Sequence, residues 1–360
     1  MTGIERTLAA LDFEPTDRAP VAGGLLQNAR YLAAKAGAAE FWDAPRQTLF
    51  EGFRRMGCDA ILGPVMPKPP EETTRDAWGR ETSFSISHAK PEIATPEGVA
   101  EYARSAPTVE QVRESFDFQG AYRDYLRVSV ETQREAGDML VIPHTLGYAP
   151  AFPTSDGVYT YEAFLMACAL YPDDMARLFA AWGETARCRY ETAAAAIREH
   201  DLPRIIWTGQ DICDAKGPVL SPALLERLYF PVLSRAFEPL KQAGIRIVWH
   251  ADANYRQIIP RMVELGVDGF QGLYETPDGV RLEDLARMRS RDGRPPILFG
   301  SVSTVWVLPH GGPDDVRREV ERCIRAVGGQ GGLLIAPSSS IGPEVPWENV
   351  DAMYERALEG

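Results

Sequence analysis

The chain has 360 residues with a formal net charge of −13, and 45% of them are hydrophobic and 25% charged, which is an ordinary globular composition. No stretch concentrates lysine and arginine, so the sequence argues against a nucleic-acid partner. The N-terminus has no apolar signal segment, and no apolar run is long enough to span a bilayer. We therefore expect a cytoplasmic protein with no membrane contact, acting as a monomer or homodimer.

Short apolar strands alternate with helices along most of the chain. Strands are predicted at residues 18–25, 59–65, 138–145, 204–211, 245–250, 269–275, 296–301 and 332–337. Helices are predicted at 2–11, 45–56, 96–104, 108–136, 161–200 with a break at Pro172, from 221, and at 255–265, 282–288, 313–327 and 347–358. A polar insertion at 67–92 contains an alternating run and predicts a hairpin over one end of the molecule.

Eight apolar strands, most of them followed by a helix, predict an α/β fold of the (β/α)8 TIM-barrel type. The doubly wound alternative needs a glycine-rich phosphate loop after a strand, and residues 21–25 match that loop poorly. We expect a single barrel domain over residues 1–360, with an N-terminal helical and hairpin elaboration. The five cysteines include no CxxC pair, which predicts reduced thiols without a disulfide framework.

In a barrel, the carboxyl ends of the strands form the site. The apolar run at 245–249 switches abruptly to His250, Asp252 and Asn254. Because alternate residues of a strand point to the same face, His250 and Asp252 are expected to lie together. The other strand ends add the candidates Gln27, Asn28, Met66, His144, Tyr148, Gln210, Asp211, Asp214, Tyr274, Glu275, Ser301, Ser338, Ser339 and Ser340.

Two chemistries fit these residue types. His250 and Asp252, with either Glu275 or His144, could hold a divalent ion that keeps a position open for substrate. The alternative is that Asp252 caps the following helix and His250 only hydrogen-bonds a neighbour. Asp211, at the end of a buried strand, could instead have a raised pKa and act as an acid, or it could serve as a helix or loop cap.

Several of these stretches resemble one enzyme family. Residues 209–222 are similar to the GDDLGTQKGPLISP-like segment of the uroporphyrinogen decarboxylase superfamily, and residues 245–254 resemble its hxHxCGN strand. Residues 299–312 resemble its GGIDTQxxLPxGTP segment, and residues 331–347 resemble its GGYILAPSHNIxPDVPxEN close. Residues 76–79 fit its N-terminal insertion. The resemblance covers nearly the whole chain and implies a TIM barrel.

The superfamily contains cofactor-free decarboxylases of uroporphyrinogen and methyltransferases that work with corrinoid proteins, usually with zinc. The arginine-rich RQAGR motif of the decarboxylases corresponds here to residues 23–31, which keep only Arg30, and their late histidine corresponds to Ser339. One arginine is too few for a substrate that bears many carboxylates, and the two departures together argue against porphyrinogen decarboxylation. The zinc-binding HxC motif of the thiol methyltransferases corresponds to His250 and Asp252, and the second cysteine falls at Ser338 or Ser339.

The resemblance therefore implies a methyltransferase that moves a methyl group from a small methoxylated or N-methylated substrate to a corrinoid protein or a related acceptor. The residues that would hold zinc are His250, Asp252 and Glu275. The catalytic candidates are Asp211, His250 and Tyr148. The substrate-binding candidates are Asn28, His144, Gln210, Tyr274 and Ser339. The alternatives are a metal-free decarboxylase or lyase acting on a small carboxylate with Asp211 as the acid, and a non-catalytic barrel that binds a small ligand or corrinoid.

Overall fold

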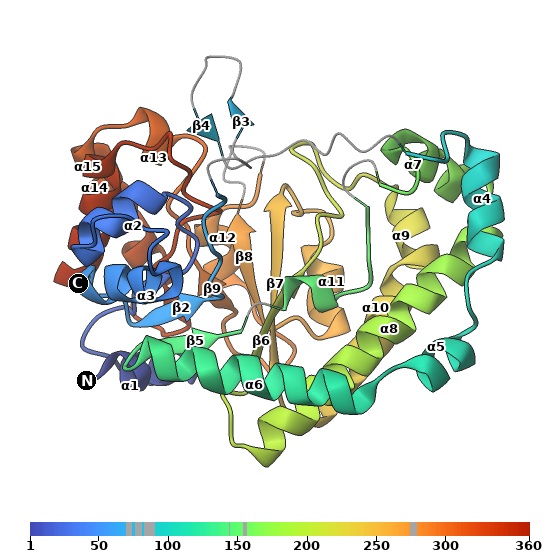
Figure 1. The fold of residues 1–360 in the computed structure, drawn as a ribbon, viewed down its shortest axis with the longest axis horizontal. Helices are drawn as coiled ribbons and strands as arrows, with labels where there is room; N and C mark the ends of the chain where they lie inside the picture. The colour runs from blue at the N-terminus through green and yellow to red at the C-terminus, as the bar shows by residue number, and fades with distance from the viewer. Residues whose placement is uncertain (70–73, 76–80, 83–90, 144, 154–156, 274–278) are drawn as a thin grey trace. The chain divides into compact units, whose positions relative to one another are not determined.

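The computed structural model describes the chain except for residues 70–73, 76–80, 83–90, 144, 154–156 and 274–278 (Figure 1). The chain divides into two compact units. Unit 1 comprises Met1–Ser85, Val128–His144 and Gly269–Gly360. Unit 2 comprises Ile86–Arg127 and Thr145–Asp268.

Unit 1 is built on six parallel strands within its described part. They are β1 (Ala22–Gly23), β2 (Ala60–Leu62), β5 (Leu140–Ile142), β8 (Gly269–Leu273), β9 (Ile297–Phe299) and β10 (Leu333–Leu334). β2 pairs with both β1 and β5, and β9 pairs with both β8 and β10. Parallel bridges between Val21 and Ile335 and between Leu26 and Ile341 join the two sets. The strands are buried along their length, as expected for parallel strands covered by helices.

Helix α1 precedes these strands, and the other helices of unit 1 each come after one of them in the chain. They are α1 (Gly3–Leu11), α2 (Ala29–Ala36), α3 (Pro45–Arg55), α12 (Leu282–Arg287), α13 (Val307–His310), α14 (Pro313–Val327) and α15 (Trp347–Glu359). A two-stranded antiparallel hairpin, β3 (Thr74–Arg75) with β4 (Glu81–Thr82), lies within the insertion where the sequence predicts one.

Unit 2 contains two parallel strands, β6 (Ile205–Gly209) and β7 (Arg246–Ala253), which run side by side in Figure 1. Its helices are α4 (Pro96–Arg104), α5 (Val109–Ser115), η2 (Leu146–Tyr148), α7 (Tyr161–Leu170), α8 (Pro172–Glu199), α9 (Pro222–Leu228), α10 (Phe230–Gln242) and α11 (Ile259–Leu265). Helix α6 (Phe118–Ala136) begins in unit 2 and ends in unit 1.

Six parallel strands in unit 1 and two in unit 2 match the eight predicted strands, and the α/β fold class is confirmed. The single-domain organisation stays a prediction. All five cysteines are buried free thiols, as expected. In the described ranges, no helix is both long and apolar enough to cross a membrane.

Prolines set several of the helix starts that the sequence predicts. Pro45, Pro96, Pro172 and Pro313 each occupy the first helical position, where the missing N–H has no helical partner to lose. The predicted helix at 108–136 is instead interrupted, because Phe116 is extended and ends α5. The sequence analysis also missed α2, which Asn28 caps by accepting the N–H of Tyr31.

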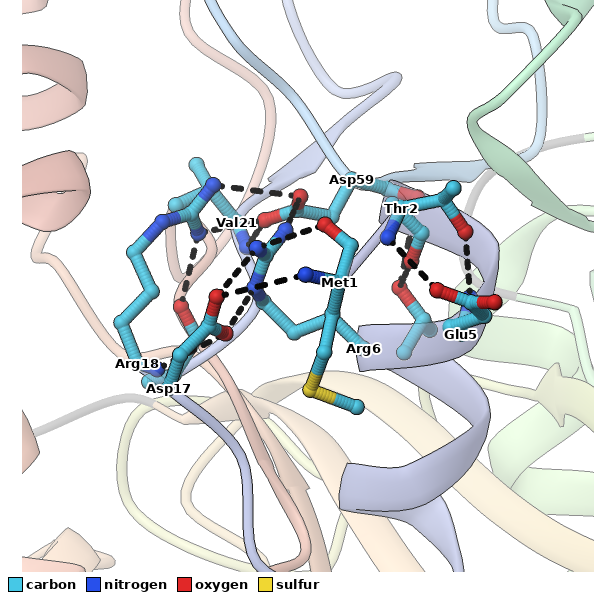
Figure 2. Close-up of polar contacts among 11 residues, drawn as sticks. Met1, Thr2, Glu5, Arg6, Asp17, Arg18, Val21 and Asp59 are labelled. Atoms are coloured by element: carbon cyan, nitrogen blue, oxygen red, sulfur yellow. Dashed lines mark hydrogen bonds and ion pairs between the residues drawn. The ribbon is translucent and has the colours of Figure 1, made fainter.

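A buried ion network in unit 1 fixes the chain just before β1 and β2 (Figure 2). Asp59 accepts hydrogen bonds from Arg6 at 2.6 Å and from Arg18 at 2.5 and 3.1 Å, and it also accepts the N–H of Val21 at 2.9 Å. Arg6 additionally pairs with Asp17, which holds the pKa of Asp17 well below its usual range. The network ties α1 to the start of two parallel strands.

Candidate active site at the ends of two parallel strands

The close approach of β6 and β7 brings the candidate residues of unit 2 together. Gly209 pairs with His250, and a Cβ at position 209 would lie 2.0 Å from the carbonyl oxygen of His250. Only glycine fits there without moving one of the strands. The residues that follow Gly209 therefore lie beside the polar end of β7.

Buried hydrogen bonds hold β6 in place. The Thr208 hydroxyl bonds both the Thr145 carbonyl, at 3.0 Å, and the Tyr190 hydroxyl, at 2.6 Å. Thr145 in turn donates to the carbonyl of Trp207 at 2.6 Å. Because each of these three buried hydroxyls has a partner, the network stabilises the strand and none of the three is left unsatisfied.

Asp211 is half-buried just beyond β6. Its Oδ1 accepts the main-chain N–H of Asp252 at 3.0 Å, so its hydrogen bond is to the neighbouring strand and not to a helix terminus. Burial raises the pKa of Asp211 and the charge of Asp252 raises it further, whereas His250 and the hydrogen bond from Asp252 lower it. The net direction is upward, which favours the protonated acid more than in water.

His250 and Asp252 lie on one face of β7, as predicted. His250 Nε2 is 3.6 Å from Asp252 Oδ1, and the two side chains are 14% and 38% exposed. The His250 ring also packs edge-on against Trp207, with ring centroids 5.7 Å apart. The imidazole is thus supported on one side and remains partly accessible on the other.

The alternative in which Asp252 caps the next helix is wrong. β7 continues to Ala253, and α11 begins at Ile259 with Ile258 as its N-cap and no side-chain cap. The predicted helix at 255–265 therefore starts four residues later than expected. Asp252 belongs to the strand and does not cap α11.

The loop after β6 is anchored to the end of β7. The Asn254 N–H donates to the Asp214 carbonyl at 2.9 Å, and Asp214 Oδ1 accepts the N–H groups of Lys216 and Gly217 at 2.7 and 3.0 Å. This turn assigns the Asp214 carboxylate a structural role. Gln210 is half-buried between β6 and Asp211.

Tyr161, which the sequence analysis treated only as the start of a helix, interacts electrostatically with this cluster. Burial raises the pKa of Tyr161, and the negative charges of Asp214 and Asp211 raise it further. The sequence around Tyr161 indicates only the start of α7, which Thr160 caps, so it gives no sign that this side chain interacts with the two aspartates.

Tyr148 lies in a group of aromatic side chains in unit 2. Its ring is 6.1 Å from the ring of Tyr190 and 6.4 Å from that of Tyr125, and the Arg189 guanidinium lies 5.8 Å from its centroid. Burial raises the pKa of Tyr148. The catalytic role expected for Tyr148 stays a prediction.

Two further substrate-binding candidates belong to unit 1. Asn28 is buried, and its side-chain oxygen caps α2 at 3.0 Å from the Tyr31 nitrogen. Ser339 is half-buried and follows Ser338, whose hydroxyl bonds Thr304. The substrate contacts expected for Asn28, Gln210 and Ser339 stay predictions.

The predicted zinc site is only partly within the described residues. His250 and Asp252 supply two donor groups that lie close enough to share one ion. The third candidates, Glu275 and His144, lie outside the described residues, as does Tyr274. Within the described ranges, no group of three histidine, cysteine or acidic residues is arranged to hold a metal. Zinc binding therefore stays a prediction.

Comparison with known proteins relates this chain to families of enzymes. Residues 209–359, which include Asp211, His250 and Asp252, match the family described as uroporphyrinogen decarboxylase (URO-D). Two uroporphyrinogen decarboxylases from strains of Thermus thermophilus are 28% and 27% identical to this chain over 191 residues. Each match spans 53% of this chain and 49% of the relative, so it covers about half the length of these relatives.

A methyltransferase from Methanosarcina mazei has a similar fold, with a TM-score of 0.62 and 18% identity over 100% of this chain and 99% of its own. At this identity the likeness concerns the fold alone. The family match and the curated relatives confirm the resemblance to the uroporphyrinogen decarboxylase superfamily that the motifs indicated. Enzymes of two activities thus appear among the proteins that this chain resembles.

Proposed function

We propose that this protein is a methyltransferase of the uroporphyrinogen decarboxylase superfamily. It would take a methyl group from a small methoxylated or N-methylated compound and pass it to a corrinoid protein or a related acceptor. The observation that carries the proposal is the pairing of a half-buried Asp211 of raised pKa with His250 and Asp252 on the adjoining strand.

Asp211 is suited to supply a proton. When a methyl group leaves an ether or amine, the remaining oxygen or nitrogen gains electron density and must be protonated. A carboxylic acid whose pKa is raised by burial keeps its proton to higher pH and can donate it in that step. The N–H of Asp252 occupies Oδ1 of Asp211, which leaves Oδ2 to carry the transferable proton.

His250 and Asp252 would bind the polar head of the substrate beside this acid. The corrinoid, carried by its partner protein, would supply the nucleophile that accepts the methyl group. Zinc held by His250, Asp252 and Glu275 would add Lewis-acid polarisation of the leaving heteroatom. The proton transfer uses Asp211 alone, and a cytoplasmic location and a monomeric or dimeric state remain part of the proposal.

A second candidate is metal-free decarboxylation of a small carboxylate. It is favoured by the curated relatives, which are uroporphyrinogen decarboxylases, and by the raised pKa of Asp211, since the carbon that loses carbon dioxide must gain a proton. The two reactions differ in product: one transfers a methyl group, and the other releases carbon dioxide.

The deciding experiment is a screen of methoxylated, N-methylated and carboxylated small compounds with the full chain. Methyl transfer is followed by the absorbance change of added reduced cobalamin, and decarboxylation by release of carbon dioxide. For whichever turnover is found, Asp211→Asn should lower the rate by about 10²- to 10⁴-fold, the usual contribution of a general acid.

Asp214→Asn is the matched control, because asparagine keeps the Oδ1 acceptor of the loop turn. It should retain most of the activity. Release of carbon dioxide without methyl transfer would contradict the methyltransferase proposal and support the decarboxylase. If Asp211→Asn retains the wild-type rate, Asp211 is not the acid in either reaction. If a ligand raises the melting temperature but no turnover occurs, the protein is a non-catalytic barrel that binds a small ligand.

A further inference from the structure

Unit 2 contains a cavity between the start of α6 and the second half of α8 that the proposed chemistry does not use. Its volume is about 350 Å³, within the usual range for a small-molecule pocket. None of its lining residues belongs to the Asp211–His250 cluster, to the stretches that resemble the superfamily's motifs or to residues 209–359, which match the family. Its ligand therefore has to be inferred from the cavity's own side chains.

Two rows of side chains on α6 line this cavity. Phe118 and Tyr122 are four positions apart, and so are Gln119 and Arg123, so each pair lies along one line of the helix surface. The aromatic pair is half-buried, whereas the polar pair is exposed. The first row therefore forms an apolar wall, and the second forms a polar edge beside it.

The opposite wall, on α8, is made of small side chains. Thr192 and Ala195 line the cavity, in a stretch with four consecutive alanines at 193–196. Helix α8 thus offers the rings of α6 no large partner at this point, and a gap remains between the two helices. The Thr192 hydroxyl donates to the Arg189 carbonyl at 2.7 Å, so it has no hydrogen left for a ligand. A flat apolar group fits such a gap.

Both rings of the apolar wall are held in place by other side chains. The Phe118 ring meets the Phe116 ring edge-on, with centroids 4.9 Å apart and an interplanar angle of 69°. The Tyr122 hydroxyl donates to Glu199 Oε2 at 2.5 Å and lies 3.1 Å from His200 Nε2. A wall whose orientation is fixed before a ligand arrives loses little side-chain entropy on binding.

The charge that the cavity offers a ligand is positive. Its lining acid, Glu191, is bonded through both oxygens by Arg113, at 3.0 and 2.9 Å, and Arg113 also pairs with buried Glu184 at 3.3 Å. The negative charge of Glu191 is thus balanced within the protein. The other charged lining residue is Arg123, which is exposed and forms no ion pair within the described part of the chain.

From these features we propose that the cavity is a binding site for a planar aromatic carboxylate. The ring system lies against Phe118 and Tyr122, opposite the small side chains of α8, and the carboxylate pairs with Arg123 at the polar edge. An arginine fork beside aromatic rings favours a planar anion over a cation of the same shape and over a puckered ring of the same charge. The inference concerns binding in unit 2 and stands apart from methyl transfer or decarboxylation.

The test uses three probes of similar size: naphthoate, its saturated analogue decalincarboxylate, and the cation naphthylmethylamine. Calorimetric titration of the full chain should give saturable naphthoate binding with a dissociation constant of about 1 mM or tighter. Decalincarboxylate should bind at least several-fold more weakly, and naphthylmethylamine should not bind. Arg123→Met should weaken naphthoate binding by about tenfold, as expected for a lost charge-assisted bond.

Ala195→Leu should also weaken naphthoate binding, because the added carbon atoms fill the gap between the helices. Arg235→Met and Ala180→Leu are the matched controls: both residues belong to unit 2 and lie outside the cavity, so their variants should bind naphthoate as the wild type does. Absence of saturable naphthoate binding overturns the proposal. Binding that neither Arg123→Met nor Ala195→Leu weakens overturns it too, because the ligand then lies elsewhere, for example at the Asp211–His250 cluster. Since no turnover is measured, neither result bears on the activity of Asp211.

Discussion

Asp59 and Asp211 are both acidic residues removed from bulk water next to parallel strands, yet their surroundings are opposite. Asp59 precedes β2 and accepts four hydrogen bonds, three from the guanidinium groups of Arg6 and Arg18 and one from the main chain (Figure 2). Asp211 follows β6 and accepts one main-chain hydrogen bond, with the carboxylate of Asp252 nearby. The first carboxylate is neutralised by cations, whereas the second has its pKa raised.

This difference distinguishes a carboxylate that stabilises the fold from one that can donate a proton in a reaction. A buried carboxylate with two arginine partners stays charged and contributes through its bonds, and in a barrel-type fold the amino end of the strands is where such stabilising residues lie. A carboxylate whose desolvation outweighs its favourable interactions tends toward its protonated form, as Asp211 does. The distinction makes three predictions.

The largest effect is expected for Asp59→Asn. It would leave Arg6 and Arg18, whose side chains are 9% and 16% exposed, without their shared anion. Breaking a buried ion pair on one side costs about 3–5 kcal/mol of unfolding free energy. Urea denaturation followed by circular dichroism measures it. Asp173→Asn is the control, because its pair with Arg227 is exposed and should contribute at most about 1 kcal/mol. Equal losses in both variants would contradict the structural role of Asp59.

A smaller effect of opposite sign is expected for Asp211→Asn. Because the folded state raises the pKa of Asp211, this residue's contribution to stability is full below its unfolded pKa of about 3.9 and is lost as the pH rises through the folded pKa. Asparagine does not ionise and avoids that loss. The variant should therefore gain stability relative to wild type as the pH rises to neutrality, seen in thermal melts across a pH series. A difference that is constant with pH would refute the raised pKa.

The smallest effect is expected for Asp252→Asn. The charge of Asp252 contributes to the raised pKa of Asp211, but burial is the larger cause. Removing the charge should lower the pKa of Asp211 only modestly and leave it above its ordinary value. The shift can be measured by carbon-detected NMR titration of the Asp211 carboxyl, with Asp214→Asn as the control. A fall to the ordinary value would mean that Asp252, and not burial, governs the site.

Much of the fold follows from local sequence. Pro96 and Arg104 bound α4 as predicted, and Pro172 separates α7 from α8, because proline positions and apolar periodicity act within a few residues. The break at Phe116 and the late start of α11 at Ile259 were missed although local signals are present. Asp117 accepts the N–H of Gly120 at the start of α6, and Pro260 lies in the first turn of α11. The link between Arg6 and Asp59 spans 53 positions and has no local signal at all.

Strand periodicity alone predicted part of the candidate site. The spacing of His250 and Asp252 predicted their shared face correctly, because residues two apart in a strand point the same way. The hydrogen bond from Asp252 to Asp211 and the electrostatic effect of both aspartates on Tyr161 depend on how separate segments of the chain meet, which periodicity does not predict.

The bond between Asp252 and Asp211 has a consequence for how this site can change over time. Its donor is the main-chain N–H, which every residue except proline provides at position 252. The side chain there can therefore be exchanged, for a thiolate or a neutral group, while the acid at position 211 keeps its anchor. Affinity for a metal or a substrate head depends on β7, whereas the proton is supplied from the end of β6, so a shared scaffold can change one property while the other is retained.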